Sequence, residues 1–472
     1  MIPMTLREIA ERIDGRLLLA EGTGEGDIIR GLSDTDSRKI GTGDIFFAKP
    51  GEVTDGHLYA PKAVENGAAL AVVERELELG IPQIVVDDVV AALGQLATEV
   101  VERVRQHGRM RVVAVTGSNG KTTTKNLLKA IFERHGNVVA PIASFNNEVG
   151  APTTFLQVTE ETDTLIAEMG ASKVGEIRYL TNMARPDIGI VLMVGLAHAG
   201  EFGGIEMIEK AKAEMVEALG EGGVAVLNAD DPRVVKMAQK APGEVVWFGR
   251  GESAQIRATD VEVSQQGTRF VLHSPNHDPV SVEFSVIGEH HVMNALAATA
   301  AAHAAGIPIT DVVEVLTTVT RAERWRMEVL TREPITVIND AYNANPNSMA
   351  AALRTLAQIA NPGQRTVAVL GQMSELGDQS VFEHDKLGEL AVRLGVSQTV
   401  VIGRDARPLY LAAVAQGSWD NEATFAEDAD EAFDFLRGYL QPGDLVLVKS
   451  SNSAGLRMLG DRLGDYVKGT LA

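Results

Sequence analysis

The chain has 472 residues, and at about 150 residues per domain this length predicts about three domains. Apolar residues make up 45% of the chain and charged residues 23%, which excludes a chain that is mostly disordered, collagen-like or coiled coil. The 43 basic and 64 acidic residues leave a net charge of −21, a field that repels nucleic-acid phosphates and anionic lipids. We therefore expect no nucleic-acid partner and no membrane insertion.

The sequence lacks cysteines and a signal-peptide core, and these two absences restrict the chemistry and the cellular compartment that we expect for the protein. The sequence contains no cysteine, which excludes disulfides, thiolate zinc sites, iron–sulfur clusters and a cysteine nucleophile. The first residues lack the unbroken apolar core of a signal peptide. The longest apolar stretch, residues 188–199, is too short to span a bilayer. The sequence therefore predicts a cytoplasmic protein.

Short runs of Val, Ile and Leu alternate with longer helical patterns, which predicts parallel sheets covered by helices. In residues 1–88 the expected strands are 44–48, 68–73 and 84–86. A helix over 91–105 then leads into a strand at 111–115, followed by strands at 164–167, 187–194 and 223–227. Past Ser253 the apolar period changes to two, which predicts an antiparallel meander with its first turn at 265–267. An Ala-rich packing helix follows at 292–305.

The last third of the chain again alternates strands, at 335–338, 366–370, 399–402 and 444–448, with helical patterns. The fold class expected is therefore α/β with three domains, at 1–88, 89–323 and 324–472. The first is a small α/β domain. The second has a mostly parallel sheet plus the antiparallel meander, as in P-loop ATPases, and the third is Rossmann-like.

The strongest local signal is the run from Arg111 to Lys125, where a buried strand enters a glycine-containing loop and a helix follows. Glycines let backbone N–H groups turn toward phosphate oxygens, and the helix N-terminus adds a positive dipole. This predicts a phosphate site made by Gly117, Ser118, Asn119, Gly120, Lys121, Thr122 and Thr123. Lys121 is placed for the β- and γ-phosphates and Thr122 for Mg²⁺. Val115 stands where the usual motif has its first glycine, so a plain glycine-rich turn is the alternative.

Polar residues follow three central strands: Glu168, His198 and the run from Asn228 to Asp231. Ligands bind beyond the carboxyl ends of parallel strands, and a carboxylate and an imidazole beside a triphosphate suit divalent cations. Each residue taken alone is more often a cap or a loop hydrogen bond. Their convergence on one sheet edge favours a site.

Together these motifs resemble the Mur ligase superfamily, the amide-bond-forming enzymes of peptidoglycan precursor assembly. The matching pieces are the loop at 116–123, Asn146-Asn147-Glu148, Glu168-Met169-Gly170 and Ala211-Lys212-Ala213-Glu214. The resemblance implies ATP and two Mg²⁺ ions, with catalytic roles for Lys121, Glu168, His198 and Lys212, metal contacts from Thr122, Glu168, His198 and Lys212, and substrate contacts from Asn146 and Asn147. It also implies that Lys212 is carboxylated in some members. From the residues alone, Lys212 is a solvated helical lysine paired with Glu209 or Glu214.

Two further segments fit the same family. Gly288 to Ala298 resembles the element that closes over adenine, which implies nucleotide contacts from Asn294 and His290. The segment from Asp36 to His57 resembles the UDP-sugar domain, which implies uridine or diphosphate contacts from Ser37 and Arg38. A surface ion pair is the commoner fate of such an arginine.

The segment from Ile338 to Met349 follows a strand, and Pro346 then opens a helix that continues to about residue 360. An Asn-rich turn with a helix cap is the bland alternative. The segment resembles that of the family members that add D-alanyl-D-alanine, which implies an ATP contact from Asp340 and substrate contacts from Tyr342, Asn343 and Asn345. Arg324 is the implied second ATP contact. The family usually has Gly before that arginine, whereas this chain has Glu323, so Arg321 or Arg326 is the alternative.

The resemblance implies an ATP-dependent ligase that joins UDP-N-acetylmuramoyl-tripeptide to D-alanyl-D-alanine through an acyl phosphate, as a monomer. The alternatives are a family ligase that adds a single amino acid, a nucleotide-hydrolysing switch, and a UDP-sugar-binding scaffold with a decayed ATP site.

Overall fold

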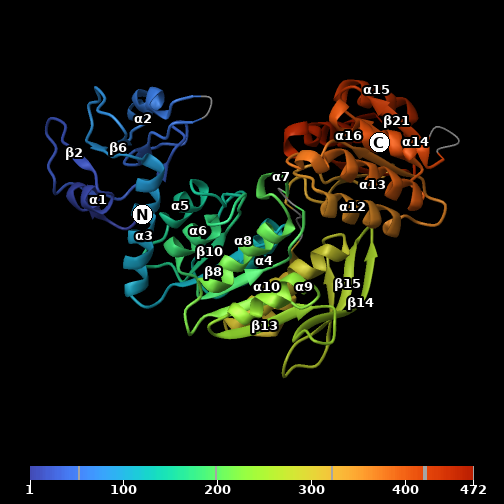
Figure 1. Cartoon of the computed structure of the whole chain (residues 1–472), viewed down its shortest axis with the longest axis horizontal. Helices are drawn as coiled ribbons and strands as arrows, with labels where there is room; N and C mark the ends of the chain where they lie inside the picture. Colours follow the sequence, from blue (N-terminus) through green and yellow to red (C-terminus); the bar gives the residue numbers. More distant parts are fainter. Residues whose placement is uncertain (52–53, 197–198, 320–322, 418–421, 471–472) are drawn as a thin grey trace.

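The structure is a computed structural model that describes residues 1–51, 54–196, 199–319, 323–417 and 422–470. Three α/β units follow one another along the chain. The first and the last stand apart on the same side of the middle unit (Figure 1). The α/β class with three units is as predicted. In the part of the chain that the structure describes, no helix is long and apolar enough to cross a membrane.

The N-terminal unit contains a five-stranded sheet in the order β2-β7-β6-β5-β4 and a separate pair, β1 and β3. Its elements are β1 (Met4–Thr5), α1 (Leu6–Arg12), β2 (Arg16–Leu18), β3 (Ile28–Ile29), β4 (Ser33–Asp34), β5 (Ile45–Phe47), α2 (Ala60–Glu65), β6 (Leu70–Val73) and β7 (Gln83–Val85). Helix α3 (Val89–Gln106) follows and packs mainly against α5 and α6 of the central unit. The three predicted strands are confirmed as β5, β6 and β7, and the predicted helix as α3. Strands β1 to β4 were not predicted, because two or three residues are too few to show alternation.

The central unit carries a nine-stranded sheet in the order β16-β15-β14-β13-β12-β11-β8-β10-β9. Its strands are β8 (Arg111–Thr116), β9 (Val138–Val139), β10 (Thr164–Glu168), β11 (Ile188–Val191), β12 (Val224–Asn228), β13 (Glu244–Gly249), β14 (Ile256–Ser264), β15 (Gly267–His273) and β16 (Val280–Phe284). Its helices are α4 (Lys121–Phe132), α5 (Gly150–Phe155), α6 (Glu176–Ala184), α7 (Ala199–Phe202), α8 (Ile205–Glu217), α9 (Pro232–Met237), α10 (Glu289–Ala304) and α11 (Ile309–Thr318).

The predicted meander is confirmed, since β14, β15 and β16 are antiparallel and the first turn lies between Ser264 and Gly267. Three details differ from the sequence prediction, the first being the two-residue strand β9, which is too short to show a pattern. Strand β13 was not predicted, because a four-residue apolar run fits a helix as well as a strand. It joins the meander to the parallel sheet by pairing in parallel with β14. Strand β11 ends at Val191, three residues before the predicted end, because the chain there leaves the sheet toward the phosphate loop.

The C-terminal unit has a six-stranded sheet in the order β17-β18-β22-β19-β20-β21, parallel except for β17. Its elements are β17 (Glu328–Thr331), β18 (Thr336–Asn339), α12 (Pro346–Ile359), β19 (Thr366–Leu370), α13 (Ser380–Arg393), β20 (Gln398–Ile402), α14 (Arg407–Ala415), β21 (Ala423–Ala426), α15 (Ala429–Tyr439), β22 (Leu445–Lys449) and α16 (Leu456–Thr470). The four predicted strands are confirmed as β18, β19, β20 and β22. Edge strands β17 and β21 are half-buried and were not predicted.

Helices cover both faces of the two large sheets. In the central unit, α4, α10 and α11 pack on one face and α5, α6 and α8 on the other. The apolar core between the central sheet and helices α5, α6 and α8 continues through α3 into the N-terminal unit. In the C-terminal unit, α12 to α14 cover one face and α15 and α16 the other. These layers leave the carboxyl ends of the strands free to carry a site.

Candidate active site

The loop between β8 and α4 has the backbone of a phosphate-binding turn. Gly117 and Gly120 have φ angles of 155° and 85°, a region that L side chains rarely adopt. Helix α4 begins at Lys121, directly after Gly120, so the N–H groups of its first turn have no partner within the helix. The predicted order of strand, glycine loop and helix is therefore confirmed.

A cavity of about 500 Å³ lies over this loop, between the central and C-terminal units, and we call it the loop cavity. Its walls combine the phosphate loop, the end of β10, the first turn of α10 and the segment that enters α12. Many of the predicted site residues line it: Ser118, Asn119, Gly120, Lys121, Thr122, Thr123, Asn146, Glu168, His290, Asn294, Asp340, Tyr342, Asn343 and Asn345. The structure thus gathers motifs that are far apart in the sequence.

Lys121 is the cation at the floor of this cavity. Its Nζ donates to the carbonyl oxygen of Gly117 at 2.8 Å. Burial lowers the pKa of Lys121, an effect that the nearby Glu168 charge opposes and Arg326 reinforces. An anion with several negative oxygens in the cavity would offset this desolvation, as a polyphosphate does.

Glu168, the last residue of β10, has one committed and one free carboxylate oxygen. Oε1 accepts hydrogen bonds from Asn146 Nδ2 at 2.7 Å and Thr122 Oγ1 at 3.3 Å. Oε2 is buried and has no hydrogen-bond partner among the residues that the structure describes. A buried carboxylate oxygen without a partner is costly, and a cation removes that cost.

These groups fit a magnesium ion, which prefers carboxylate, hydroxyl, phosphate and water oxygens. Thr122 supplies a buried hydroxyl, which bonds the other oxygen of the same carboxylate, Glu168 Oε1. No group of three His, Asp or Glu side chains converges on one point within the described ranges. His198, the other predicted ligand on this edge, lies outside the described residues.

The segment before α12 crosses from the C-terminal unit onto the phosphate loop. Asn345 Nδ2 donates to Asn119 Oδ1 at 2.7 Å, and Asn345 Oδ1 caps α12 by accepting from the Ser348 N–H at 2.9 Å. The hydroxyl of Tyr342 donates to Ser144 Oγ at 3.0 Å. The structure therefore places the predicted substrate residues Tyr342, Asn343 and Asn345 against the nucleotide loop, with Asn345 both a helix cap and a contact between units.

Asp340 is held by a buried lysine at the end of β22. Lys449 Nζ lies 2.6 Å from Asp340 Oδ2 and also donates to the Asn343 carbonyl at 3.1 Å. The other oxygen of Asp340 accepts from the Met327 N–H. Asp340 is thus fixed in orientation at the cavity wall.

Of the two arginines near the start of β17, the structure places Arg326 and not Arg324 in the cavity. Arg326 Nη2 donates to Thr122 Oγ1 at 3.0 Å, and its guanidinium lies 4.0 Å from the centre of the Tyr342 ring. Arg324 is exposed and pairs with Asp461 at 2.8 Å. Arg321, the other alternative, lies outside the described residues.

The first turn of α10 closes the cavity on the side of the glycine loop. The Oδ1 atom of Asn294 stands 2.2 Å from where a Cβ atom on Gly120 would lie, so any side chain at this position would displace Asn294. Burial lowers the pKa of His290 to about 4 and that of His291 well below its usual value. His291 Nε2 is buried without a partner, which leaves a neutral imidazole nitrogen in the wall for a ligand.

Lys212 lies on α8, and its side chain is buried rather than solvated. Burial lowers its pKa well below the usual value, and the charge of nearby Lys121 acts in the same direction. Glu214 is not its partner, because both carboxylate oxygens of Glu214 accept backbone N–H groups, from Gly175 and Arg178. The alternative of a solvated, paired lysine is therefore wrong.

The remaining predicted residues lie outside the loop cavity. Arg38 is exposed and forms a two-bond pair with Asp36, and Ser37 is buried beside it in the N-terminal unit. Asn147 lines an adjoining cavity of about 300 Å³, which shares Lys121 and Asn146 with the first. In the run after β12, Asp231 caps α9 and accepts from the Val194 N–H, so it has a structural role.

Four residues of the site were not singled out by the sequence. Ser144 Oγ contacts Thr122, Arg326 and Tyr342. Lys125 is buried on α4 and donates to the Pro141 carbonyl at 2.8 Å, which anchors the segment that carries Ser144. Lys449 and His291 complete the wall. Only Lys449 left a signal in the pattern, since it ends a run of buried apolar residues.

Comparison with known proteins agrees with this geometry. Three family models match the chain: Mur ligase family, catalytic domain, over residues 33–107; Mur ligase middle domain, over 115–302; and Mur ligase, glutamate ligase domain, over 325–452. Together they cover most of the sequence. The chain belongs to the Mur ligase family.

Within that family, full-length relatives identify the branch. The UDP-N-acetylmuramoyl-tripeptide–D-alanyl-D-alanine ligase of Mycobacterium tuberculosis is 41% identical, with 98% of each chain covered. The crystal structure of MurF from Acinetobacter baumannii superposes with a TM-score of 0.88 at 32% identity, covering 98% of this chain and 99% of that one. MurF from Thermotoga maritima in complex with ADP superposes with a TM-score of 0.81 at 25% identity, covering 93% and 98%. The chain is a Mur ligase of the MurF type.

Proposed function

We propose that this protein is an ATP-dependent ligase that forms an amide bond between UDP-N-acetylmuramoyl-tripeptide and D-alanyl-D-alanine, in peptidoglycan precursor synthesis. The observation that carries the proposal is the contact of Asn345 with the phosphate loop, supported by Tyr342, which bonds Ser144 beside Thr122 of that loop. It joins an acceptor-binding unit to a nucleotide site, an arrangement that a plain ATP-hydrolysing switch does not need. The relatives that share nearly the whole chain bear the same ligase name.

ATP occupies the loop cavity in this account. The backbone of residues 117–123 and Lys121 bind its phosphates, and Asn294 and His290 border the nucleoside side. Magnesium, when bound, would offset the negative charge of the transferring phosphoryl group. Thr122 and the free Oε2 of Glu168 are the described residues that would hold it, with His198 proposed beside them.

Chemistry begins when the terminal carboxylate of the tripeptide attacks the γ-phosphorus and ADP leaves. The carboxylate becomes an acyl phosphate, whose phosphate is a far better leaving group than an oxide. The amine of D-alanyl-D-alanine then attacks the acyl carbon, loses a proton and expels phosphate. Lys121 and Arg326 lie where negative charge increases in the first step.

Lys212 suits the carboxylated state that we propose for it. Only a neutral amine reacts with CO₂, and burial favours the neutral form of this lysine. No side chain in the described ranges pairs with its amine. A carbamate there would supply two oxygens for a second magnesium ion.

We place the acceptor beyond the carboxyl ends of β19 and β22. These strands are neighbours, yet the helices that follow them, α13 and α16, cover opposite faces of the sheet. Such a switch point is where open α/β sheets bind ligands. Ser374, Ser451 and Ser453 meet there, with hydroxyl oxygens 2.7 to 3.2 Å apart, and can donate to the dipeptide carboxylate.

The proposal also covers the UDP-sugar site, the domain boundaries, the number of chains and the cellular location. The UDP-sugar is placed at the N-terminal unit near Ser37 and Arg38, with the tripeptide reaching the adjoining cavity at Asn147. Domain boundaries are proposed at 88/89 and 323/324. One copy is proposed to suffice, because residues of a single chain form the loop cavity, and the need for ATP supports a cytoplasmic location.

The test compares two lysine variants of α4. Lys121→Met removes the cation at the cavity floor, and Lys129→Met removes a half-exposed lysine that pairs only with Glu133. We expect Lys121→Met to lose ligation by at least a thousandfold with its thermal unfolding unchanged, and Lys129→Met to keep wild-type rates. Full turnover in Lys121→Met would remove the phosphate loop from the mechanism.

A further inference from the structure

The five residues before β17 carry Arg326 into the loop cavity, and we call residues 323–327 the arginine segment. Both neighbours of Arg326 have left-handed backbones, since φ is 61° at Trp325 and 50° at Met327. L side chains adopt this region only at a cost. Such strain persists where the surrounding structure holds the residue firmly, and it is common at functional sites. The surroundings of the arginine segment must therefore fix its conformation.

The side chain of Trp325 anchors the segment to the C-terminal unit. Its Nε1 donates to the carboxylate of Asp461 on α16, 3.0 Å from Oδ2 and 3.2 Å from Oδ1. The guanidiniums of Arg324 and Arg457 lie over the indole, 4.7 Å and 5.3 Å from the ring centre. Asp461 Oδ1 also accepts from Asn339 Nδ2, at the end of β18, at 3.1 Å. Helix α16 and strand β18 thus hold the indole in one place.

The backbone on either side of Arg326 is bonded to the wall of the loop cavity. The carbonyl of Trp325 accepts from the Tyr342 N–H at 3.0 Å. Met327 is buried, and its N–H donates to Asp340 Oδ1 at 3.0 Å. The arginine segment therefore has fixed points directly before and directly after the arginine.

These anchors determine where the guanidinium of Arg326 lies. While the indole of Trp325 contacts α16, Arg326 Nη2 donates to Thr122 Oγ1 at 3.0 Å and to Ser144 Oγ at 3.3 Å. An arginine has many rotamers, and a charged group contributes to a reaction only when it is held in the productive geometry. A fixed backbone is thus a condition for the effect of Arg326 on the phosphate loop.

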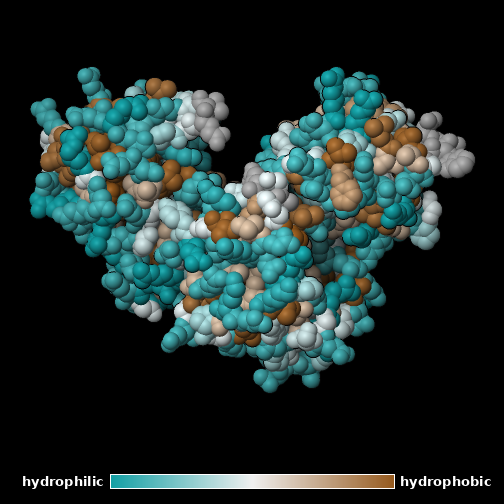
Figure 2. Space-filling model, in the orientation of Figure 1, coloured by the Kyte–Doolittle hydropathy of each residue, from teal (hydrophilic) through white to brown (hydrophobic). Residues whose placement is uncertain are grey.

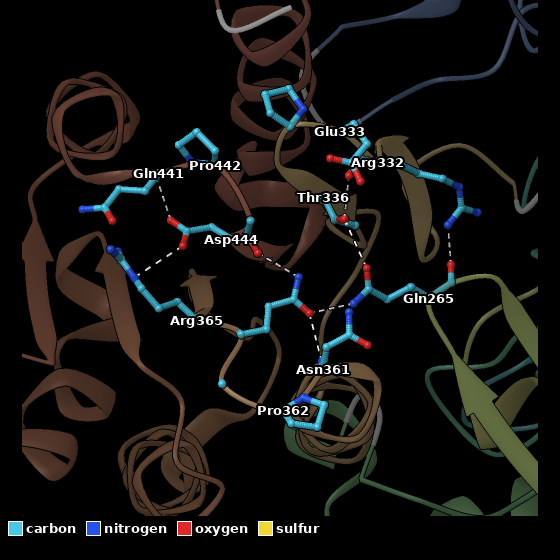
Figure 3. Close-up of a pocket in the computed structure, with 14 residues that line it drawn as sticks. Gln265, Arg332, Glu333, Thr336, Asn361, Pro362, Arg365, Gln441, Pro442 and Asp444 are labelled. Carbon is cyan, nitrogen blue, oxygen red and sulfur yellow. Dashed lines mark hydrogen bonds and ion pairs between the residues drawn. The ribbon is translucent and has the colours of Figure 1, made fainter.

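The junction of the two units has a second contact that does not involve the arginine segment. Figure 2 shows an open notch between the N-terminal and C-terminal units, so the C-terminal unit is oriented by its contacts with the central unit. One contact lies at the opposite end of β18, where Gln265 Oε1 accepts from Thr336 Oγ1 at 3.3 Å (Figure 3). Gln265 Nε2 also donates to the Ile359 carbonyl at 3.1 Å. This contact joins the units at a distance from Arg326, which makes it a useful comparison.

We propose that Trp325 is a positioning residue for phosphate transfer: bonded to Asp461, it holds the arginine segment so that Arg326 meets the transferring phosphoryl group. The inference rests on the proposed function, because it assigns Trp325 to one step of that reaction. Trp325 itself lies outside the lining of the loop cavity, whereas Arg326 is part of it. Trp325 therefore acts through Arg326.

A double-mutant cycle on the full chain tests this proposal. Trp325→Phe keeps a ring but removes the N–H bonded to Asp461, which retains Arg324 and Asn339 as partners. We expect kcat for ligation to fall at least fivefold, with the KM for D-alanyl-D-alanine and the thermal unfolding unchanged. In an Arg326→Gln background the same substitution should change kcat less than twofold, because no arginine remains to be positioned.

Three more variants sharpen the cycle. Trp325→Gly removes the whole anchor while glycine adopts a φ of 61° without strain, so kcat should fall at least as far as in Trp325→Phe. Gln265→Leu loosens the junction instead, and its effect on kcat should be the same with and without Arg326. Trp247→Phe makes the matched exchange on β13 and should keep the wild-type kcat.

The outcomes separate the positioning role from the proposed function. An equal loss of kcat from Trp325→Phe in both backgrounds overturns the proposal, as does a wild-type kcat in both Trp325 variants or in Arg326→Gln. If the wild-type chain ligates nothing, the proposed function fails, and the cycle is measured on the affinity for the β,γ-imido analogue of ATP. Weakening by Trp325→Phe only when Arg326 is present then supports the positioning role, and equal weakening in both backgrounds overturns it.

Discussion

The contact between Gly120 and Asn294 gives a quantitative test of the loop cavity. In Gly120→Ala, the new Cβ would meet Asn294 Oδ1 at 2.2 Å and Leu192 Cδ1 at 3.2 Å. Contacts below 3.0 Å do not persist, so the side chain of Asn294 must move by about 1 Å. The position also has a φ of 85°, which costs an alanine about 1 kcal/mol of folding stability whatever its surroundings.

The matched control is Gly306→Ala. Gly306 has a φ of 78°, and a Cβ there would meet no atom within 4 Å. Both variants therefore lose about 1 kcal/mol through the backbone. Gly120→Ala alone also pushes Asn294 off its rotamer and away from His291, which costs about 1 to 3 kcal/mol at the nucleotide site.

Calorimetric titration with ADP measures the difference. An added cost of about 1.4 kcal/mol corresponds to a tenfold change in affinity, so we expect Gly120→Ala to bind ADP at least tenfold more weakly than Gly306→Ala. Denaturant unfolding should show a loss of about 1 kcal/mol for Gly306→Ala and a larger loss for Gly120→Ala, because the displacement of Asn294 adds to the backbone cost. Equal ADP affinities would refute the assignment of Asn294 to the nucleotide pocket.

Three further predictions concern single residues. Asn345→Asp keeps the oxygen that caps α12 but loses the donor to Asn119, so the free energy of unfolding should stay unchanged while the KM for ATP rises several-fold. Asn345→Ala loses both the donor and the cap, so its free energy of unfolding should also fall by about 1 kcal/mol. Lys212 should give a carbamate signal in carbon-13 NMR with labelled bicarbonate, and CO₂-free buffer should lower the rate; a rate independent of CO₂ and no signal contradict carboxylation. Burial lowers the pKa of His290 from 6.5 to about 4, so as the pH falls the unfolded chain binds a proton before the folded chain does. The free energy of unfolding should therefore fall by about 3 kcal/mol as the pH drops from 6.5 to 4. In His290→Gln that part of the acid loss should be absent from urea unfolding curves.

Most strands and helices could be predicted, because their apolar residues recur with a clear period and glycines mark where the elements end. The strands that were missed are short or lie at edges, such as β17 and β21, where half-burial blurs the pattern. The pairing of β13 with β14 could not be predicted, since pairing depends on tertiary contacts and not on either strand alone.

The residues of the candidate site also fall into those that the sequence could predict and those that it could not. The phosphate loop and Glu168 were predictable, because each stands at the end of a strand or the start of a helix, whereas Asn294 followed only from the family resemblance. Ser144 was not, since a loop serine has no period and acquires its three partners only when the units meet. Arg326 was left as an alternative to Arg324, because sequence spacing does not say which side chain turns inward.

The central claim is that ATP phosphorylates the tripeptide carboxylate so that the amine of D-alanyl-D-alanine can form an amide bond with it. The direct measurement is phosphate release from ATP with UDP-N-acetylmuramoyl-tripeptide, with and without D-alanyl-D-alanine, together with the mass of the nucleotide product. The account predicts release that depends on the dipeptide and a UDP-N-acetylmuramoyl-pentapeptide product, with no ligation of D-alanine alone. Release at the same rate without the dipeptide, or ligation of a single amino acid in its place, would contradict it.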